Sequence, residues 1–244
     1  MNTSPQHHPD KNLLTEFAAG CLDSAPAIAV STHLHYCSHC RNEVRKLEQV
    51  GAALFSASVD DDLDQQQVDK PDVESITVSD SAFTSLMEKI EALVGVPKQM
   101  ADNHTKMALT TLSKKYELMP KVVQKMMTDN PIRWRTVTRN LRSAKLVAGQ
   151  DKYAVSLQKI LAGGQVPEHE HTASEITVVL NGSFSDEDSV YQQGDFLLKN
   201  AGDKHQPLAS NNDDCLCLSV EQAPVKLTGF FMRWLNPFIR FTPA

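Results

Sequence analysis

A short run of histidine and cysteine near the N-terminus constrains the fold of this chain more than any other feature. His33, Cys37 and Cys40 follow an H-x-x-x-C-x-x-C spacing, which presents one imidazole and two thiolates within about two turns of helix. Positions 33 and 37 project from one helical face, and Cys40 can reach the same ion across a helix junction. Donors of this kind at this spacing are typical of a zinc half-site. We therefore predict a structural zinc that organises a small helical domain.

A structural zinc takes four ligands, so one more donor is needed. The candidates are His7, His8, His35, His39 and Cys21. His35 points away from the face that carries the motif, and His39 lies between the two cysteines, where the geometry is awkward. This leaves His7 or His8, either of which would fold back from the N-terminus and tie the first helix to the next two. A DNA-binding zinc finger is disfavoured, because it would need a second closely spaced ligand pair and a basic helix.

A second metal signature lies in the C-terminal half. His169 and His171 would share one face of a strand, Glu175 would return from the next turn, and His205 follows later. These residues fall in two segments that fit the two cupin motifs. The alternating strand patterns that follow Trp134 predict an all-β double-sheet jelly roll. Three histidines and one carboxylate suit zinc, iron or manganese, so we predict one of these metals in the barrel.

Length and composition favour a soluble protein of two small domains. The chain has 244 residues, five cysteines and a net charge of -6. The odd number of cysteines suits metal ligation better than a disulfide framework. Residues 1–11 contain no apolar segment of a signal peptide, and no stretch approaches the roughly 20 apolar residues that span a bilayer. Because nucleic-acid binding needs a basic surface, we expect a cytoplasmic protein with no membrane and no direct nucleic-acid contact.

The pattern of apolar and charged residues divides the chain into parts. Helical periodicity predicts helices over 13–18, from 24 to 37 and from about 40 onward. Residues 58–79 carry seven carboxylates against one lysine and are expected to form a flexible acidic loop. A fourth, amphipathic helix is predicted over 80–95, docked either on the first three or on another protein.

The predicted fold class is α+β multidomain. An all-α zinc-binding domain occupies 1–95, a linker 96–119, and an all-β cupin jelly-roll barrel 120–244. We expect each domain to have its own core, because the linker separates them. Cys215 and Cys217 would share one face of a strand, where core packing is favoured and a redox or ligand role stays open.

The N-terminal half also resembles a known family. The run from Leu13 to Gly20, followed by His33, Cys37 and Cys40, resembles the ChrR family of cupin-containing zinc-binding anti-sigma factors. The resemblance continues through Leu118-Met119-Pro120, Ile132–Arg135, the cupin segments, Asp214–Leu218 and Pro237–Arg240. It implies that the N-terminal zinc ligand is His8, by its offset from Leu13-Leu14, and that 1–95 is an anti-sigma domain.

The resemblance implies a regulatory function without catalysis. The N-terminal helices would bind an extracytoplasmic-function sigma factor and block its contacts with core RNA polymerase. The cupin domain would sense singlet oxygen or related oxidants, after which the sigma factor is released. Imidazole and thiol groups are chemically reasonable targets for such oxidants.

A second hypothesis is a metal-dependent, dioxygenase-like cupin enzyme that carries a zinc-binding interaction module. Open sites of three histidines and one glutamate support such chemistry. The sequence offers no recognisable set of substrate-binding residues beyond the metal ligands, however, and the N-terminal domain would be unexplained. We therefore favour the anti-sigma hypothesis.

Overall fold

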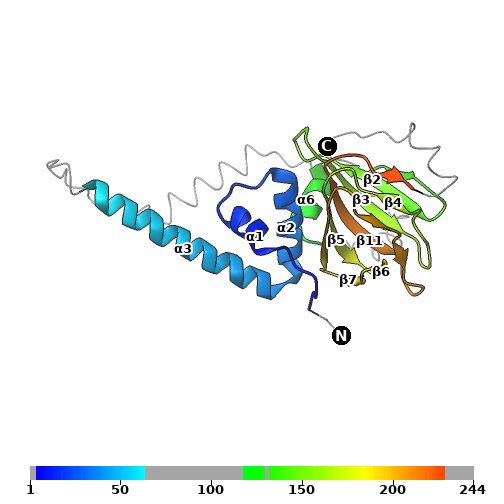
Figure 1. Cartoon of the computed structure of the whole chain (residues 1–244), viewed down its shortest axis with the longest axis horizontal. Coiled ribbons are helices and arrows are strands. Elements are labelled where there is room, and N and C mark those ends of the chain that lie inside the picture. Colours follow the sequence, from blue (N-terminus) through cyan, green and yellow to red (C-terminus); the bar gives the residue numbers. More distant parts are fainter. Residues whose placement is uncertain (1–3, 64–117, 130–131, 229–244) are drawn as a thin grey trace, which may run out of the picture. The chain divides into compact units, whose positions relative to one another are not determined.

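The computed structural model describes residues 4–63, 118–129 and 132–228 of the chain (Figure 1). The chain separates into two compact units, Met1–Ala52 with Tyr116–Ala244, and Ala53–Lys115. The first helices and all of the described strands thus belong to one unit. No described helix is long and apolar enough to cross a membrane.

The described helices are α1 (Lys11–Ala18), α2 (Ser24–Tyr36), α3 (Ser38–Leu63) and α6 (Lys121–Asp129). Asp10 caps α1, because its carboxylate accepts a hydrogen bond from the backbone N–H of Leu13 at 2.7 Å. Gly20 follows α1 at a φ of 69°, in the left-handed region that glycine adopts without strain. The first three predicted helices are therefore present, and α3 begins at Ser38, within two residues of the predicted start at about Cys40.

Helix α3 runs into the segment that the sequence predicts to be an acidic loop. The loop was placed at 58–79, yet α3 ends at Leu63, so the prediction is wrong for the first six of these residues. Extending an existing helix adds one hydrogen bond for each residue ordered and costs far less than nucleating a new one. The rest of the acidic loop, the fourth helix over 80–95 and almost all of the linker over 96–119 lie outside the described residues and stay predictions.

The described strands form three antiparallel sheets. Their bounds are β1 (Trp134–Thr136), β2 (Leu141–Leu146), β3 (Ala154–Ile160), β4 (His169–Glu170), β5 (Glu175–Asn181), β6 (Ser183–Ser185), β7 (Val190–Gln192), β8 (Phe196–Lys199), β9 (Lys204–His205), β10 (Leu208–Ala209), β11 (Cys215–Glu221) and β12 (Lys226–Leu227). A six-stranded sheet has the order β1-β2-β3-β11-β5-β8, and the smaller sheets have the orders β10-β6-β7 and β12-β4-β9. This arrangement confirms the predicted fold class, an all-β cupin beside an all-α region.

The large sheet contributes to a different core on each face. Successive side chains of a strand point to opposite faces, and on β11 Leu218 and Val220 join the cluster of the helices, whereas Cys215 and Cys217 join the cluster of the barrel interior. Helix α2 packs against β5 and β11 (Figure 1). The helices and the outer face of the sheet therefore share one hydrophobic core.

The expectation of a separate core for each domain is wrong for the described residues. Helix α2 buries Ala25, Ala29 and Val30 and also packs Ile28 and Leu34 against the same cluster. A helix that is apolar around most of its circumference must be covered on more than one side. Because α1 covers only part of α2, the sheet covers another part. The predicted boundary at residues 95 and 96 lies outside the described residues and stays a prediction.

Candidate metal centres

The H-x-x-x-C-x-x-C motif and the N-terminal segment meet in one cluster. The donor atoms of His8, His33, Cys37 and Cys40 all lie within 4.8 Å of one another. The Nδ1 of His8 is 3.4 Å from the Sγ of each cysteine. His7, the other N-terminal candidate, instead contacts the barrel through its ring. The structure thus brings together the four residues that were predicted as zinc ligands.

Three local elements position these donors. His33 lies in the last turn of α2, Cys37 follows that helix in an extended conformation, and Cys40 lies in the first turn of α3. The backbone N–H of Cys40 points to the Sγ of Cys37 at 3.4 Å, a contact that favours a thiolate at this position. His8 comes from the segment before α1. A metal bound here would therefore join the N-terminal segment, α2 and α3.

The state of the His33 ring fits a metal ligand. Its Nδ1 donates to the backbone carbonyl of Gly194 at 2.6 Å, which leaves the lone pair on Nε2. That Nε2 is buried and has no hydrogen-bond partner among the described residues. A buried nitrogen without a partner costs about 1–3 kcal/mol, and coordination to a cation would remove this cost. The orphaned nitrogen and the two thiols beside it match the donors that zinc prefers.

Burial also sets the protonation states of the cluster. It lowers the pKa of His33 to about 4, so the ring is neutral near pH 7, as a ligand must be. Burial, and then the neighbouring Cys37, raise the pKa of the Cys40 thiol to about 12 in the metal-free protein. A cation that binds here would therefore displace thiol protons, and its affinity would depend on pH.

The barrel forms one wall of this N-terminal cluster. Besides the bond from His33 to Gly194, the ring of Phe196 meets the His33 ring edge-on, with centroids 5.9 Å apart. The buried carboxylate of Asp195 accepts hydrogen bonds from the backbone N–H groups of Gln6 and His7 at 2.6 and 3.0 Å. Sequence reasoning missed these barrel residues. They lie within the second cupin motif, but nothing in their local pattern indicates a partner nearly 190 residues away.

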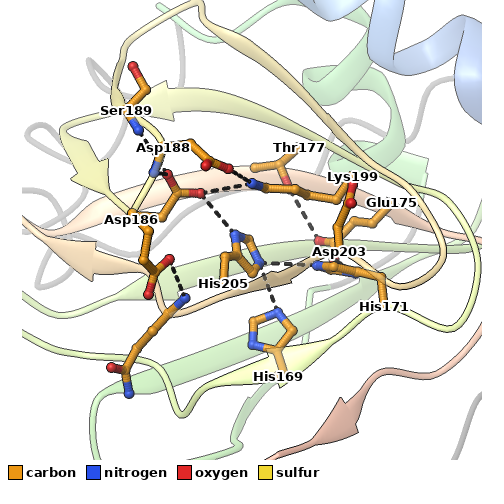
Figure 2. Close-up of polar contacts among 12 residues, drawn as sticks. His169, His171, Glu175, Thr177, Asp186, Asp188, Ser189, Lys199, Asp203 and His205 are labelled. Carbon is orange, nitrogen blue, oxygen red and sulfur yellow. Dashed lines mark hydrogen bonds and ion pairs between the residues drawn. The ribbon is translucent and has the colours of Figure 1, made fainter.

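The second cluster lies inside the barrel. The Nε2 of His205 is 2.9 Å from that of His169 and 3.1 Å from that of His171, and all three rings are buried. Figure 2 shows the three rings converging. Nitrogen ligands at about 2.1 Å from a metal lie about 3 Å from one another when they share one face of it. The three histidines therefore fit a transition-metal site, supplied by β4, the residue after it and β9.

Glu175, the fourth predicted ligand of this site, contacts one of the histidines. Its Oε2 is 3.1 Å from the Nδ1 of His171, and its Oε1 accepts hydrogen bonds from Ser219 and Thr177 at 2.9 and 3.2 Å. Burial by itself would raise the pKa of Glu175, but the bond with His171 and the nearby histidine rings lower it overall. In this structure Glu175 orients the His171 ring and is not part of the convergent group.

A second carboxylate orients His205. Asp186 Oδ2 lies 3.2 Å from His205 Nδ1 and 3.3 Å from the Lys199 ammonium, which also pairs with Asp188 at 2.5 Å (Figure 2). Burial, followed by the neighbouring His169, lowers the pKa of His205 to about 4. Its ring is then neutral, with Nδ1–H donating to Asp186 and Nε2 turned toward the cluster. Asp186 was not foreseen, because it lies 19 residues before its histidine in an ordinary turn sequence.

A cavity of about 500 Å³ opens beside His169 and His205. It is lined by His169, Glu175, His205 and Glu221, among mainly apolar side chains. A cavity of this volume is large enough for a small organic molecule. Burial and the nearby charge of Glu175 raise the pKa of Glu221 to about 8. Glu221 was missed, although it continues the inward alternation of β11 that begins at the first of its two cysteines.

Both cysteines of β11 pack in the barrel core, as was favoured. Cys215 and Cys217 are buried, their Sγ atoms are 3.6 Å apart, and Cys217 also lines the cavity.

Comparison with known proteins finds a match for the barrel alone and a match for nearly the whole chain. Residues 123–225 match the ChrR cupin-like domain. Over 238 residues the chain is 29% identical to the anti-sigma-E factor ChrR of Cereibacter sphaeroides, a match that covers 96% of this chain and 98% of the relative. The chain is thus similar to ChrR over nearly its whole length.

A solved structure that contains ChrR shows the same likeness. The crystal structure of Rhodobacter sphaeroides SigE in complex with the anti-sigma ChrR contains a chain that is 27% identical. The match covers 89% of this chain and 99% of that chain, with a TM-score of 0.60. The likeness to ChrR therefore includes the N-terminal helices as well as the barrel.

Proposed function

We propose that this chain is an anti-sigma factor that sequesters an extracytoplasmic-function sigma factor. The observation that carries the proposal is the nearly complete match with ChrR, because it includes the helices and the barrel alike. The ChrR chain of the matching crystal structure is in complex with SigE. In this function the helices hold the sigma factor away from core RNA polymerase in the cytoplasm. No catalytic step is required, so the dioxygenase-like hypothesis is set aside.

Exposed apolar side chains on α3 support a protein partner. Val50 and Leu54 lie one turn apart and are 58% and 68% exposed, and Phe55 is 72% exposed. Charged side chains usually occupy such positions on a helix that faces water. We propose that a sigma factor covers this apolar surface of α3.

The two clusters support two metal sites with different roles. We propose zinc at His8, His33, Cys37 and Cys40, where it would cross-link the segments that hold the sigma factor. In the barrel we propose zinc, or iron or manganese, at His169, His171 and His205, with Glu175 as orienting residue or further ligand. The first set contains thiols, and three of its four residues are buried, which suits a structural zinc site. The second set contains only nitrogen and oxygen donors and borders a cavity.

The barrel is the part we propose to sense oxidants such as singlet oxygen. Its cavity gives a small molecule access to oxidisable groups, namely the imidazoles of His169 and His205 and the Cys217 thiol. The wall that the barrel forms for the N-terminal cluster supports a transfer of the signal. Sensing would therefore end in release of the sigma factor.

Co-purification tests the proposed partner. Each extracytoplasmic-function sigma factor of the source genome is co-expressed with the tagged full-length chain, and we expect one of them to be retained at near-equal stoichiometry. Retention of none would contradict the anti-sigma function.

A reporter gene driven by the retained sigma factor tests the sensing step, with and without a photosensitiser and light. We expect light to induce the reporter with the parent chain. With His169→Ala we expect repression to persist and induction to be lost. Normal induction with this variant would contradict a sensing role for the barrel site.

A further inference from the structure

The two metal clusters are connected by a continuous series of short contacts. The series begins in the barrel, where the Nδ1 of His205 is 3.2 Å from Asp186 Oδ2. The carboxylate of Asp186 is fully buried, so it cannot exchange this partner for water without moving. A displacement of the His205 ring therefore displaces the carboxylate of Asp186 as well.

Asp186 also sets the shape of the turn between β6 and β7. Its Oδ1 accepts hydrogen bonds from the backbone N–H groups of Asp188 and Ser189 at 3.0 and 3.1 Å. Its own N–H donates to the carbonyl of Ser189 at 3.0 Å. Figure 2 shows this turn beside the three histidines. The position of Ser189 therefore depends on the carboxylate that orients His205.

Ser189 contacts the N-terminal segment, so the position of that segment depends on the turn as well. Its hydroxyl is hydrogen-bonded to the Nε2 of His7 at 2.9 Å, and the His7 ring packs on Tyr191 with centroids 4.7 Å apart. On its other side the His7 Nδ1 lies 3.2 Å from Asp195. The backbone of His7 is fixed as well, because its carbonyl accepts a hydrogen bond from Phe196 at 3.1 Å.

His7 precedes His8, the donor that lies 3.4 Å from both thiols of the N-terminal cluster. The N-terminal segment is tightly packed against the barrel at this point. Gly194 has a φ of 90°, and a Cβ there would lie 2.7 Å from Pro5 and 2.6 Å from Tyr36. A shift of His7 must therefore displace His8, because the chain on both sides of it is pressed against the barrel.

We propose that Asp186, Ser189 and His7 are positioning residues that couple the barrel cluster to the N-terminal cluster. Displacement of His205 releases the turn at 186–189, the turn releases His7, and His8 then leaves the two thiols. Within the proposed function, on which this inference rests, the opened cluster loosens the helices that hold the sigma factor. Coupling of this kind requires a contiguous physical network. Each contact between His205 and His7 is 3.2 Å or less, and His8, the next residue, lies 3.4 Å from both thiols.

A double-mutant cycle on the purified full-length chain tests the coupling. The readout is the rate at which iodoacetamide alkylates Cys37 and Cys40, followed by peptide mass spectrometry, because both thiols are buried and react only when the cluster opens. We expect His205→Ala and Ser189→Ala each to raise this rate about fivefold, the lower end of typical coupling between sites. The double variant should react no faster than the faster single variant.

Two results would overturn the coupling. Ser189→Ala could leave the alkylation rate unchanged, or the two effects could multiply to about 25-fold, as independent sites do. Lys152→Met is the matched control, since it removes a 2.5 Å ion pair with Asp23 that joins the barrel to α2 without touching either cluster. We expect it to react like the parent. An equal acceleration in this variant would show general loosening and would also overturn the coupling.

The sigma-dependent reporter separates this inference from the proposed function. We expect Ser189→Ala to raise expression without light and to leave little further induction by photosensitiser. If no sigma factor is retained, the proposed function fails, and the alkylation cycle still decides the coupling. If the sigma factor is retained and the two rate effects multiply, only the coupling fails.

Discussion

Removal of one donor from the N-terminal cluster should destabilise the barrel as well as the helices. Cys40→Ser replaces a buried thiol by a hydroxyl, which is a poor zinc ligand, while the side chain keeps almost the same size. An independent zinc module would unfold alone. In this structure α1, α2 and the outer face of the sheet share one core, so we expect a single cooperative transition for both parts.

The magnitude follows from the groups left behind. Without a bound ion, the Nε2 of His33 and the thiol of Cys37 remain buried without the partner that a metal supplies, and each costs about 1–3 kcal/mol. The sum of about 2–6 kcal/mol is a large part of the 5–15 kcal/mol typical of a folded protein. For a chain of this length each kcal/mol lowers the melting temperature by roughly 2–4 °C. We therefore expect a fall of roughly 4–24 °C.

Two probes in a Trp234→Phe background measure the effect. Circular dichroism at 222 nm follows the helices, and the fluorescence of Trp134, on β1, follows the barrel. We expect both melting curves to shift together. Cys21→Ser is the control, because Cys21 is exposed and lies outside the cluster, and it should melt like the parent. Loss of the helical signal at a temperature where the Trp134 signal is still native would refute the argument from a shared core.

Three further perturbations test the pH response, the partner surface and the barrel site. In the metal-free protein burial lowers the pKa of His33 and His205 from the unfolded value of 6.5 to about 4, so the unfolded chain binds more protons between these values. Stability should be full above pH 6.5 and should decrease as the pH falls toward 4, as thermal melts across this range will show. Leu54→Asp places a charge in the apolar surface of α3 and should weaken sigma-factor binding about tenfold or more in titration calorimetry. Asp186→Asn should lower the affinity of the barrel for its metal about 10–100-fold, measured by competition with a chelator.

For each of these perturbations, one result would contradict the prediction. A pH dependence that persists unchanged when both histidines are replaced by glutamine would contradict the assignment to burial. Val147→Asp is the control for the α3 surface, because Val147 is 50% exposed on the barrel, and equal weakening by both variants would mean a non-specific effect of charge. An unchanged affinity of the barrel for its metal in Asp186→Asn would contradict the role of Asp186 in orienting His205.

Local spacing was enough to predict the donors that lie close together in the chain. His33, Cys37 and Cys40 are fixed relative to one another by one helix end and one helix start, so their spacing already encodes the geometry of a metal site. The same holds for His169 and His171, which lie two residues apart at the end of β4. The jelly roll was also predictable, because alternation and glycine punctuation are local signals.

Only the tertiary structure decided how these pieces act on one another. Residues alone left His7 and His8 as equal candidates; the family resemblance favoured His8, and the fold places its Nδ1 between the thiols and turns His7 toward Ser189. The hydrogen bond from His33 to Gly194 joins residues 161 positions apart, and no periodicity or motif carries information over such a separation. The apolar circumference of α2 requires that the helix be covered, but it does not specify which element covers it. That the sheet of the barrel covers it, and thereby brings the two clusters within one hydrogen-bonded network, is a consequence of packing that no local pattern expresses.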